Sequence, residues 1–230
     1  MVQEIKTNPI AYRSLKACVK NYLKQQMEQG QLVPGDRIEE KELCDTLNIS
    51  RTPIREALIE LESEGFIEII PRKSIRVRKL TDKEIRDMFE VIGTLEAMAA
   101  ERAVDLLTDA DLSEMEDLYH KMLATYKRGD FDQYVDWNTK LHDFHIKLYD
   151  NKILSNIVGQ LKERLWNFPR TPFHIPEWEE MMLKDHAELV DLFQKRDKEA
   201  IKKLLMEVHW NFDRNYPFLV QYFAFTEQKS

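Results

Sequence analysis

Two arginines stand four residues apart at the start of an amphipathic segment with the sequence NISRTPIREALIELESEGF. Helical spacing places Arg51 and Arg55 on one face, whereas the apolar Ile54 and Leu61 fall on the opposite face. A guanidinium group can donate two hydrogen bonds to O6 and N7 of guanine, and Thr52 suits a phosphate or a thymine methyl group. The segment is therefore typical of a helix that reads the major groove of DNA.

A second basic group follows in the stretch IIPRKSIRVRK. Two short β-rich runs joined by PRKS predict a hairpin, and its basic side chains would contact phosphates or the minor groove. An alternative for both groups is a solvated surface on which the arginines pair with glutamates such as Glu56 and Glu60. The order of turn, helix and basic hairpin favours DNA binding. The basic residues of the hairpin are Arg72, Lys73, Arg76, Arg78 and Lys79.

Histidines in the second half of the chain have the chemistry of metal ligands. Asn138 and His142 are four residues apart and share one helix face, and His145 follows three residues later. His186 and His209 lie in two later apolar-periodic segments. Imidazole nitrogens from three helices with one oxygen donor would suit Zn²⁺ or another first-row ion. Spacing alone leaves open the alternative that each histidine is a hydrogen-bonded core or surface residue.

The elements that must position the arginines are predicted in residues 1–80. One helix should begin with Pro9 at its first position and end near Gly30, and VPGDRI should form a turn. A second helix is expected over residues 39–47, with Asn48 in a left-handed conformation after it. Ser50 should cap a third helix that stops at Gly65. Three helices followed by a hairpin predict a winged helix-turn-helix.

Residues 81–230 should form an all-helical antiparallel bundle, so that the fold is mainly α. Thr81 and Thr108 each begin a capping pattern ahead of an apolar-periodic segment. Further helices are expected over residues 131–149, 152–168, 178–194 and 198–212, and NFPRTPFHIPEW should be an irregular link. Bundles of this kind place ligand sites between their helices.

Composition supports two modules with different partners. The chain has 230 residues and a net charge of −7, but residues 1–80 contain 14 Lys and Arg against 12 Asp and Glu. Residues 81–230 contain 20 against 29, so the acidic charge belongs to the helical module. No leader or membrane-spanning pattern is found, which predicts a cytoplasmic protein without membrane contact. Cys18 and Cys44 are expected to be reduced core thiols.

The stretch PGDRIEEKELCDTLNISRTPIREALIELESEGFIEIIPRKSIRV resembles the GntR family of bacterial transcription regulators. The resemblance covers about residues 10–80 and follows the family pattern PGxxLxExxLAxxLxVSRxPVREALxxLxxEGLV. Members usually have glycine at the tip of the wing where Ser74 stands here, which bears on how deeply the wing enters the minor groove. The resemblance implies DNA contacts by Arg37, Arg51, Thr52, Arg55, Lys73 and Ser74.

Residues 81–215 resemble the all-helical FCD effector domain of the FadR subgroup. NTKLH supplies Asn138 and His142, DHAEL supplies His186 and MEVHW supplies His209 as the implied ligands of a divalent metal, with His145 as a fallback. Zinc is expected, with nickel or manganese as alternatives. Many relatives have aspartate in place of Asn138 and arginine in place of Ile92, so this chain has less charge at the site. Arginines that could bind an acidic effector are Arg102, Arg164 and Arg170.

The expected function is a transcriptional repressor that binds a pseudo-palindromic operator in double-stranded DNA as a homodimer. Two-fold symmetry doubles the few base contacts that one recognition helix can make. A small organic acid would bind beside the metal and change the placement of the winged domains. The sequence has no HExxH, Gly-x-Ser-x-Gly or phosphate-binding glycine loop, so we do not expect an enzyme. An architectural DNA-binding protein without a ligand is the alternative.

Overall fold

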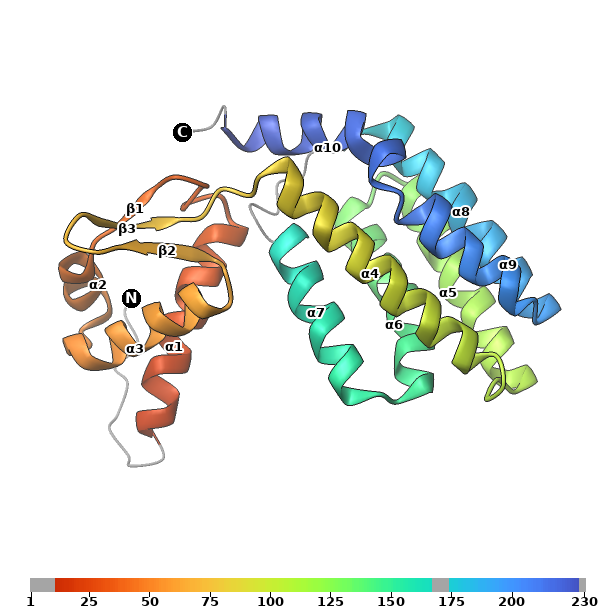
Figure 1. The fold of residues 1–230 in the computed structure, drawn as a ribbon, viewed down its shortest axis with the longest axis horizontal. Helices are drawn as coiled ribbons and strands as arrows, with labels where there is room; N and C mark the ends of the chain where they lie inside the picture. Colours follow the sequence, from red (N-terminus) through yellow and green to blue (C-terminus); the bar gives the residue numbers. More distant parts are fainter. Residues whose placement is uncertain (1–10, 167–173, 228–230) are drawn as a thin grey trace. The chain divides into compact units, whose positions relative to one another are not determined.

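The computed structural model describes residues 11–166 and 174–227, so the predicted start of the first helix at Pro9 lies outside the described residues. The chain divides into two compact units (Figure 1). The first contains the chain up to Leu80, and the second contains most of the residues from Thr81 onward.

The first unit is a winged helix-turn-helix, as the sequence predicts. Its helices are α1 (Ala11–Glu28), α2 (Glu40–Leu47) and α3 (Arg51–Ser63). Strands β2 (Ile67–Ile70) and β3 (Ser74–Val77) form the expected hairpin, with Ile67 opposite Val77. A third strand, β1 (Arg37–Ile38), lies within the segment expected to be a turn. It pairs antiparallel with β3, so the sheet order is β1-β3-β2, and its two residues are too few to show a strand pattern in the sequence.

Backbone geometry at the helix-turn-helix mostly follows the sequence signals. Asn48 is left-handed, with φ of 52°, and Gly65 has φ of 79° just after α3. Ser50 is the N-cap residue of α3, but its hydroxyl makes no capping hydrogen bond. A cap side chain accepts from the second or third helical N–H, and the third residue here is Pro53, which has none. The expected side-chain cap is therefore wrong, although the helix begins where predicted.

One apolar cluster holds the first unit together. It joins α1, α3 and the sheet, and it buries the face of α3 that turns away from the arginines. Both cysteines are free thiols, but only Cys44 fits the predicted location, because it is half-buried against this cluster whereas Cys18 is exposed. The largest fully buried side chains in the cluster are Leu23, Met27, Ile54, Leu58, Leu61 and Ile67.

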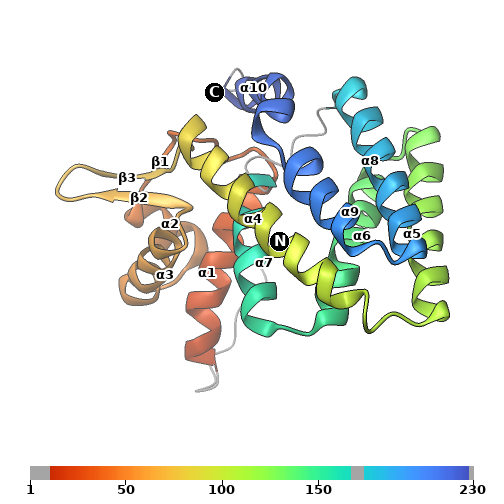
Figure 2. The same ribbon diagram turned by 45° about the vertical axis from the view of Figure 1, so that its right-hand side comes forward.

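The second unit is all-helical in its described residues (Figures 1 and 2). It contains α4 (Asp82–Ala103), α5 (Asp109–Lys127), α6 (Phe131–Tyr149), α7 (Lys152–Trp166), α8 (Pro176–Lys195), α9 (Lys198–Lys203), the π-helix η1 (Leu204–His209) and α10 (Phe212–Glu227). Helix α4 packs on α6, on α9 and on η1, and α8 packs on α5. None of the described helices is long and apolar enough to cross a membrane.

The capping boxes predicted at Thr81 and Thr108 are both present. The last predicted helix, over residues 198–212, differs from the structure. Its α-helical part ends at Lys203, the chain continues as η1, and a separate helix α10 follows, which the sequence analysis did not predict. In η1 the backbone N–H of Trp210 bonds the carbonyl of Leu205, and this wider turn leaves both His209 and Trp210 buried. Single π turns of this kind are frequent at functional sites.

Candidate DNA-reading helix and buried histidine cluster

Helix α3 separates its two faces as the sequence predicts. Arg51 and Thr52 are exposed in its first turn, and Arg55 is exposed one turn later. Pro53, Ile54, Ala57, Leu58 and Leu61 are buried beneath them. The helix therefore exposes its arginines to solvent, while its buried apolar face fixes its position in the unit.

Two of the predicted DNA-contacting arginines pair with acidic residues of their own unit. Nε of Arg55 donates to both carboxylate oxygens of Glu40, at 2.9 and 3.1 Å, which ties α3 to α2. Arg37 pairs with Glu39 at 2.6 Å. Arg51 makes no side-chain hydrogen bond or ion pair with any other described residue. Exposed ion pairs contribute little stability, so Arg55 and Arg37 can exchange their partners for a phosphate at low cost.

The turn of the hairpin is formed by Pro71, Arg72 and Lys73, all exposed, between the paired residues Ile70 and Ser74. Arg72 has φ of 60°, and the N–H of Lys73 bonds the carbonyl of Ile70 at 3.0 Å. Arg72, and not Ser74, is therefore the left-handed residue of this turn. Ser74 begins β3 and is half-buried. Lys73 is the predicted contact residue that stands at the tip.

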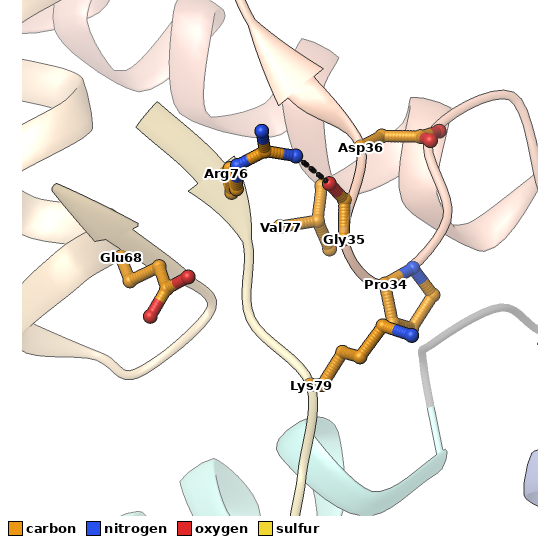
Figure 3. A pocket seen from close by; sticks show the side chains of 7 residues that line it. All are labelled: Pro34, Gly35, Asp36, Glu68, Arg76, Val77 and Lys79. Atoms are coloured by element: carbon orange, nitrogen blue, oxygen red, sulfur yellow. Dashed lines mark hydrogen bonds between the residues drawn. The ribbon is translucent and has the colours of Figure 1, made fainter. Parts of the chain in front are cut away.

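An open pocket lies between β3 and the segment before β1 (Figure 3). Nη1 of Arg76 donates to the carbonyl of Gly35 at 2.8 Å across this pocket. The side chain of Lys79 lies 3.0 Å from the position that a Cβ on Gly35 would occupy. Two carboxylates, those of Asp36 and Glu68, also line the pocket, so its lining is of mixed charge and is not a dedicated anion site.

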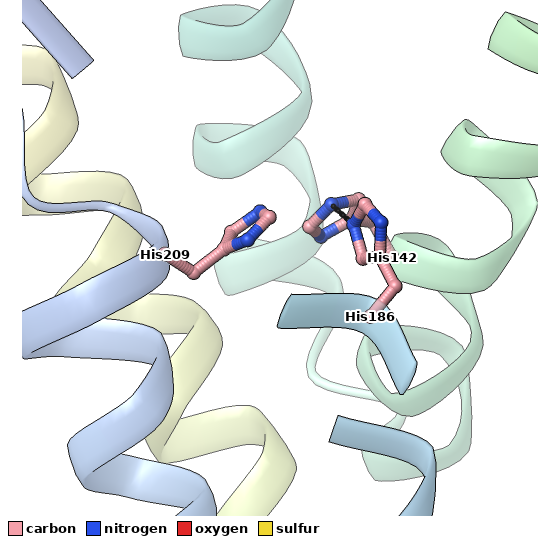
Figure 4. Close-up of side chains that lie close together, drawn as sticks. All are labelled: His142, His186 and His209. Atoms are coloured by element: carbon pink, nitrogen blue, oxygen red, sulfur yellow. Dashed lines mark hydrogen bonds between the residues drawn. The ribbon is translucent and has the colours of Figure 1, made fainter. Parts of the chain in front are cut away.

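Three of the predicted metal ligands lie together inside the second unit (Figure 4). His142 comes from α6, His186 from α8 and His209 from η1, and each is at most 6% exposed. Their ligand atoms lie within 4.8 Å of one another, and their ring centroids are 4.8 to 5.0 Å apart. Nε2 of His142 and Nε2 of His186 are 3.1 Å apart. The cluster is a near-equilateral group of three imidazoles.

Two of these imidazoles face a buried carboxylate through Nδ1. Nδ1 of His142 lies 3.1 Å from Oε2 of Glu96, and Nδ1 of His209 lies 3.4 Å from Oδ2 of Asp185. A carboxylate accepts the Nδ1 proton, which leaves the lone pair on Nε2. Carboxylate–histidine pairs of this type orient metal ligands and increase their basicity.

Each carboxylate is itself held by a cation. Lys162 of α7 pairs with Oε1 of Glu96, and Nε1 of Trp210 donates to Oε2 at 2.9 Å. Arg214 of α10 donates two hydrogen bonds to Asp185, at 2.5 and 2.8 Å. The paired charges explain how Glu96, which is 0% exposed, can be accommodated in the interior.

Electrostatics favour neutral His142 and His186 beside ionised carboxylates. Burial lowers the pKa of His142 to about 4 and holds the pKa of His186 well below its usual value. Burial alone would raise the pKa of Glu96, but the charge of Lys162 and the hydrogen bond with His142 hold it well below the usual range. Neutral imidazole is the form that binds metals.

Three residues of α6 and α8 have buried polar side-chain atoms without a hydrogen-bond partner among the described residues. Oδ1 of Asn138, one helical turn before His142, is buried without a hydrogen bond, and so is Nδ1 of His186. His145 is 0% exposed, neither of its ring nitrogens is hydrogen-bonded, and its ring lies 5.8 Å from that of Phe193. A buried amide oxygen without a partner fits the donor set expected for a metal.

Sequence reasoning missed Glu96, Asp185, Lys162, Trp210 and Arg214. Glu96 carried a signal, because it occupies a position on the apolar-periodic face of α4 that also contains Met88 and Ile92. Of the arginines suggested for an acidic effector, Arg102 is exposed and Arg164 is half-buried on α7, whereas Arg170 lies outside the described residues.

Comparison with known proteins places both units in families. Residues 15–77 match the bacterial regulatory proteins of the gntR family, and residues 87–210 match the FCD domain. The chain is 25% identical to the HTH-type transcriptional repressor RspR of Escherichia coli, in an alignment that covers 76% of this chain and 77% of RspR. It is 29% identical to the regulator McbR of Escherichia coli over 88% of its length and 92% of the relative.

A solved structure supports the same assignment over nearly the whole chain. The structure of E. coli McbR/YncC is similar with a TM-score of 0.67 and 27% identity, covering 91% of this chain and 98% of that one. The matched FCD domain alone spans more than half of the 230 residues. The chain therefore belongs to the GntR family with a C-terminal FCD domain, a family of DNA-binding transcription regulators and not of enzymes.

Proposed function

We propose that this regulator is a repressor that binds a pseudo-palindromic operator as a homodimer. The exposed first turns of α3 offer only a few side chains to base edges, and two copies related by a two-fold axis would double that number. The name of the relative RspR describes a transcriptional repressor, which supports the direction of control.

In this proposal Arg51 and Thr52 contact base edges. Arg51 makes no competing side-chain bond with the described residues. It lies in the exposed first turn of α3, a helix that is anchored by its buried apolar face. Arg55 also contacts a base edge once its ion pair with Glu40 of α2 is broken. Arg37, Lys73 and Ser74 contact phosphates around the wing, where base-independent contacts set the register.

The helical unit is proposed to hold a divalent metal ion, most suitably zinc, through His142, His186 and His209, with Asn138 as an oxygen donor. The three clustered imidazoles carry this proposal, because three histidine nitrogens are a ligand set that zinc uses, and burial lowers the pKa of His142 and His186 toward the neutral, metal-binding form. A metal with an open position supplies a cation to which an anionic ligand can bind.

A carboxylate is the effector class that the charges favour. The two buried carboxylates around the cluster, Glu96 and Asp185, are already matched by one cation each, Lys162 and Arg214. A divalent ion would therefore add two positive charges that no nearby described group offsets. An anionic ligand would balance that charge in a site shielded from water.

Metal analysis of protein purified without chelators tests the site. We expect about one equivalent of divalent metal in the parent protein and less than a tenth of that in a variant with His142→Ala and His186→Ala. His120→Ala is the matched control, because His120 is an exposed histidine of the same unit. A parent protein that carries no metal and takes up no zinc would refute the assignment.

A thermal-shift screen of organic acids against the zinc-loaded protein then tests the effector class. Carboxylates should raise Tm in the parent and lose this effect in the double histidine variant. An effect on operator affinity, measured with the same compound, would separate a regulator from an architectural DNA-binding protein.

A further inference from the structure

Helix α10 begins after the residues that match the FCD domain, which end at Trp210, and two of its side chains bond to Asp185 and to the backbone of His209. Arg214 donates two hydrogen bonds to Asp185, the carboxylate that faces Nδ1 of His209, and a third to the carbonyl of Val208 at 3.0 Å. Asp185 also precedes His186 in the chain. One side chain of α10 therefore fixes a group that touches the cluster.

Asn215 makes a second connection to the cluster. It is 1% exposed, and its Nδ2 donates to the carbonyl of His209 at 3.0 Å and to that of Asn211 at 2.8 Å. Its Oδ1 accepts from Nε1 of Trp178 on α8 at 2.7 Å. These bonds bridge the break between η1 and α10, so a displacement of the His209 backbone must move the start of α10 or break buried hydrogen bonds.

The other side of α10 binds the first turns of α4. Asp213 forms a two-point ion pair with Arg86, at 2.7 and 3.1 Å, and the Arg86 guanidinium lies over the ring of Phe212, 4.2 Å from its centroid. The hydroxyl of Tyr216, three residues after Asp213, donates to Asp82 at 2.7 Å. Thr81, the N-cap of α4, directly follows Leu80, where the continuous N-terminal segment of the first unit ends.

We propose that α10 couples the histidine cluster to the first turn of α4. Binding of a divalent ion would restrain His186 and His209, and Arg214 and Asn215 would pass that restraint to α10 as positioning residues. Asp213 and Tyr216 would then stabilise the turn that immediately follows the DNA-binding unit in sequence. The inference rests on the proposed metal site and adds the route by which that site acts.

Hydrogen exchange of the full chain, with zinc and with a chelator, tests the coupling without an operator or an identified effector. In the parent, zinc should slow exchange at residues 82–90 by about fivefold, the lower end of typical allosteric coupling. Asp213→Asn should abolish this change but keep the slowing at residues 138–146 and 183–190. Tyr216→Phe should reduce it, since only the bond to Asp82 is lost.

Asp87→Asn is the matched control. It removes an exposed ion pair with Lys83, 2.6 Å long, in the same turn of α4, and this pair does not involve α10. The control should respond to zinc as the parent does. If zinc slows exchange around the histidines but not at residues 82–90, or if Asp213→Asn behaves as the parent does, the coupling is refuted while the metal site stands. If zinc neither binds nor changes exchange anywhere, the metal site and the coupling fail together.

Discussion

Replacement of Glu96 by glutamine should weaken zinc binding without altering any proposed ligand. The glutamate carboxylate accepts the Nδ1 proton of His142 and is held by Lys162 and Trp210. Glutamine keeps the shape but removes the charge, so Nε2 of His142 becomes less basic and the ring is less firmly oriented. Loss of an outer partner of this kind typically reduces metal affinity by about 10- to 100-fold, equivalent to about 1.4–2.7 kcal/mol.

The assay is competition for zinc against a chromophoric chelator at pH 7.5, with the variant and the parent at equal concentration. Circular dichroism and urea unfolding must accompany it, because Lys162 would be left without its buried partner. Breaking a buried ion pair can cost about 3 kcal/mol or more, although Lys162 is 16% exposed and can recover some hydration.

Glu179→Gln is the matched control for this prediction. Glu179 is also a shielded carboxylate beside a histidine, 2.7 Å from Nδ1 of His174, but His174 is not part of the cluster. Zinc affinity should be unchanged in this control. Equal zinc affinities for a folded Glu96→Gln protein and the parent would show that the carboxylate does not support the site.

Three further predictions concern the DNA face, acid stability and the packing of Trp210. Arg51→Ala should lower specific operator affinity by roughly 10- to 100-fold and leave affinity for random DNA nearly unchanged, as measured by fluorescence anisotropy at fixed salt, whereas Lys203→Ala in the second unit should change neither. Burial lowers the pKa of His145 to about 4, so the folded state excludes a proton that the unfolded state binds between pH 4 and 6.5. The free energy of unfolding therefore decreases as pH falls through that window. In urea unfolding with chelator present, His145→Phe should recover about 2 kcal/mol of the loss between pH 7 and 5. An unchanged slope of the unfolding free energy against pH would contradict this. Gly93→Ala should destabilise the protein by about 1–3 kcal/mol, because the added Cβ would lie 2.8 Å from Cβ of Trp210. Gly159→Ala should stabilise it by up to about 1 kcal/mol, because a Cβ there would meet no atom within 4 Å. Equal unfolding midpoints for the two variants would refute the packing of Trp210 against Gly93.

Local signals in the sequence were sufficient for most of the fold. Apolar spacing marked the buried face of α3, the capping patterns at Thr81 and Thr108 marked two helix starts, and Asn48 marked the turn. Each of these depends on residues within one or two turns of each other. For that reason they can be read without knowing which segments meet in space.

Other features were invisible because they depend on contacts between distant segments. Strand β1 exists only because Arg37 and Ile38 meet β3, and the π turn at His209 gives no periodic signal of its own. Helix α10 contains Pro217, a residue type that argues against a helix in a sequence, yet the chain is helical on both sides of it.

The sequence by itself determined that three histidines and two arginines had the chemistry of a metal site and of a DNA reader. It did so because side-chain type and helical spacing are local properties. Only the tertiary structure decided that His142, His186 and His209 meet, and that Glu96 and Asp185 face two of them with a cation behind each. Those partners come from α4, α7, α8 and α10, and burial makes their charges matter, since a low-dielectric interior strengthens each pairing and penalises each unpaired charge.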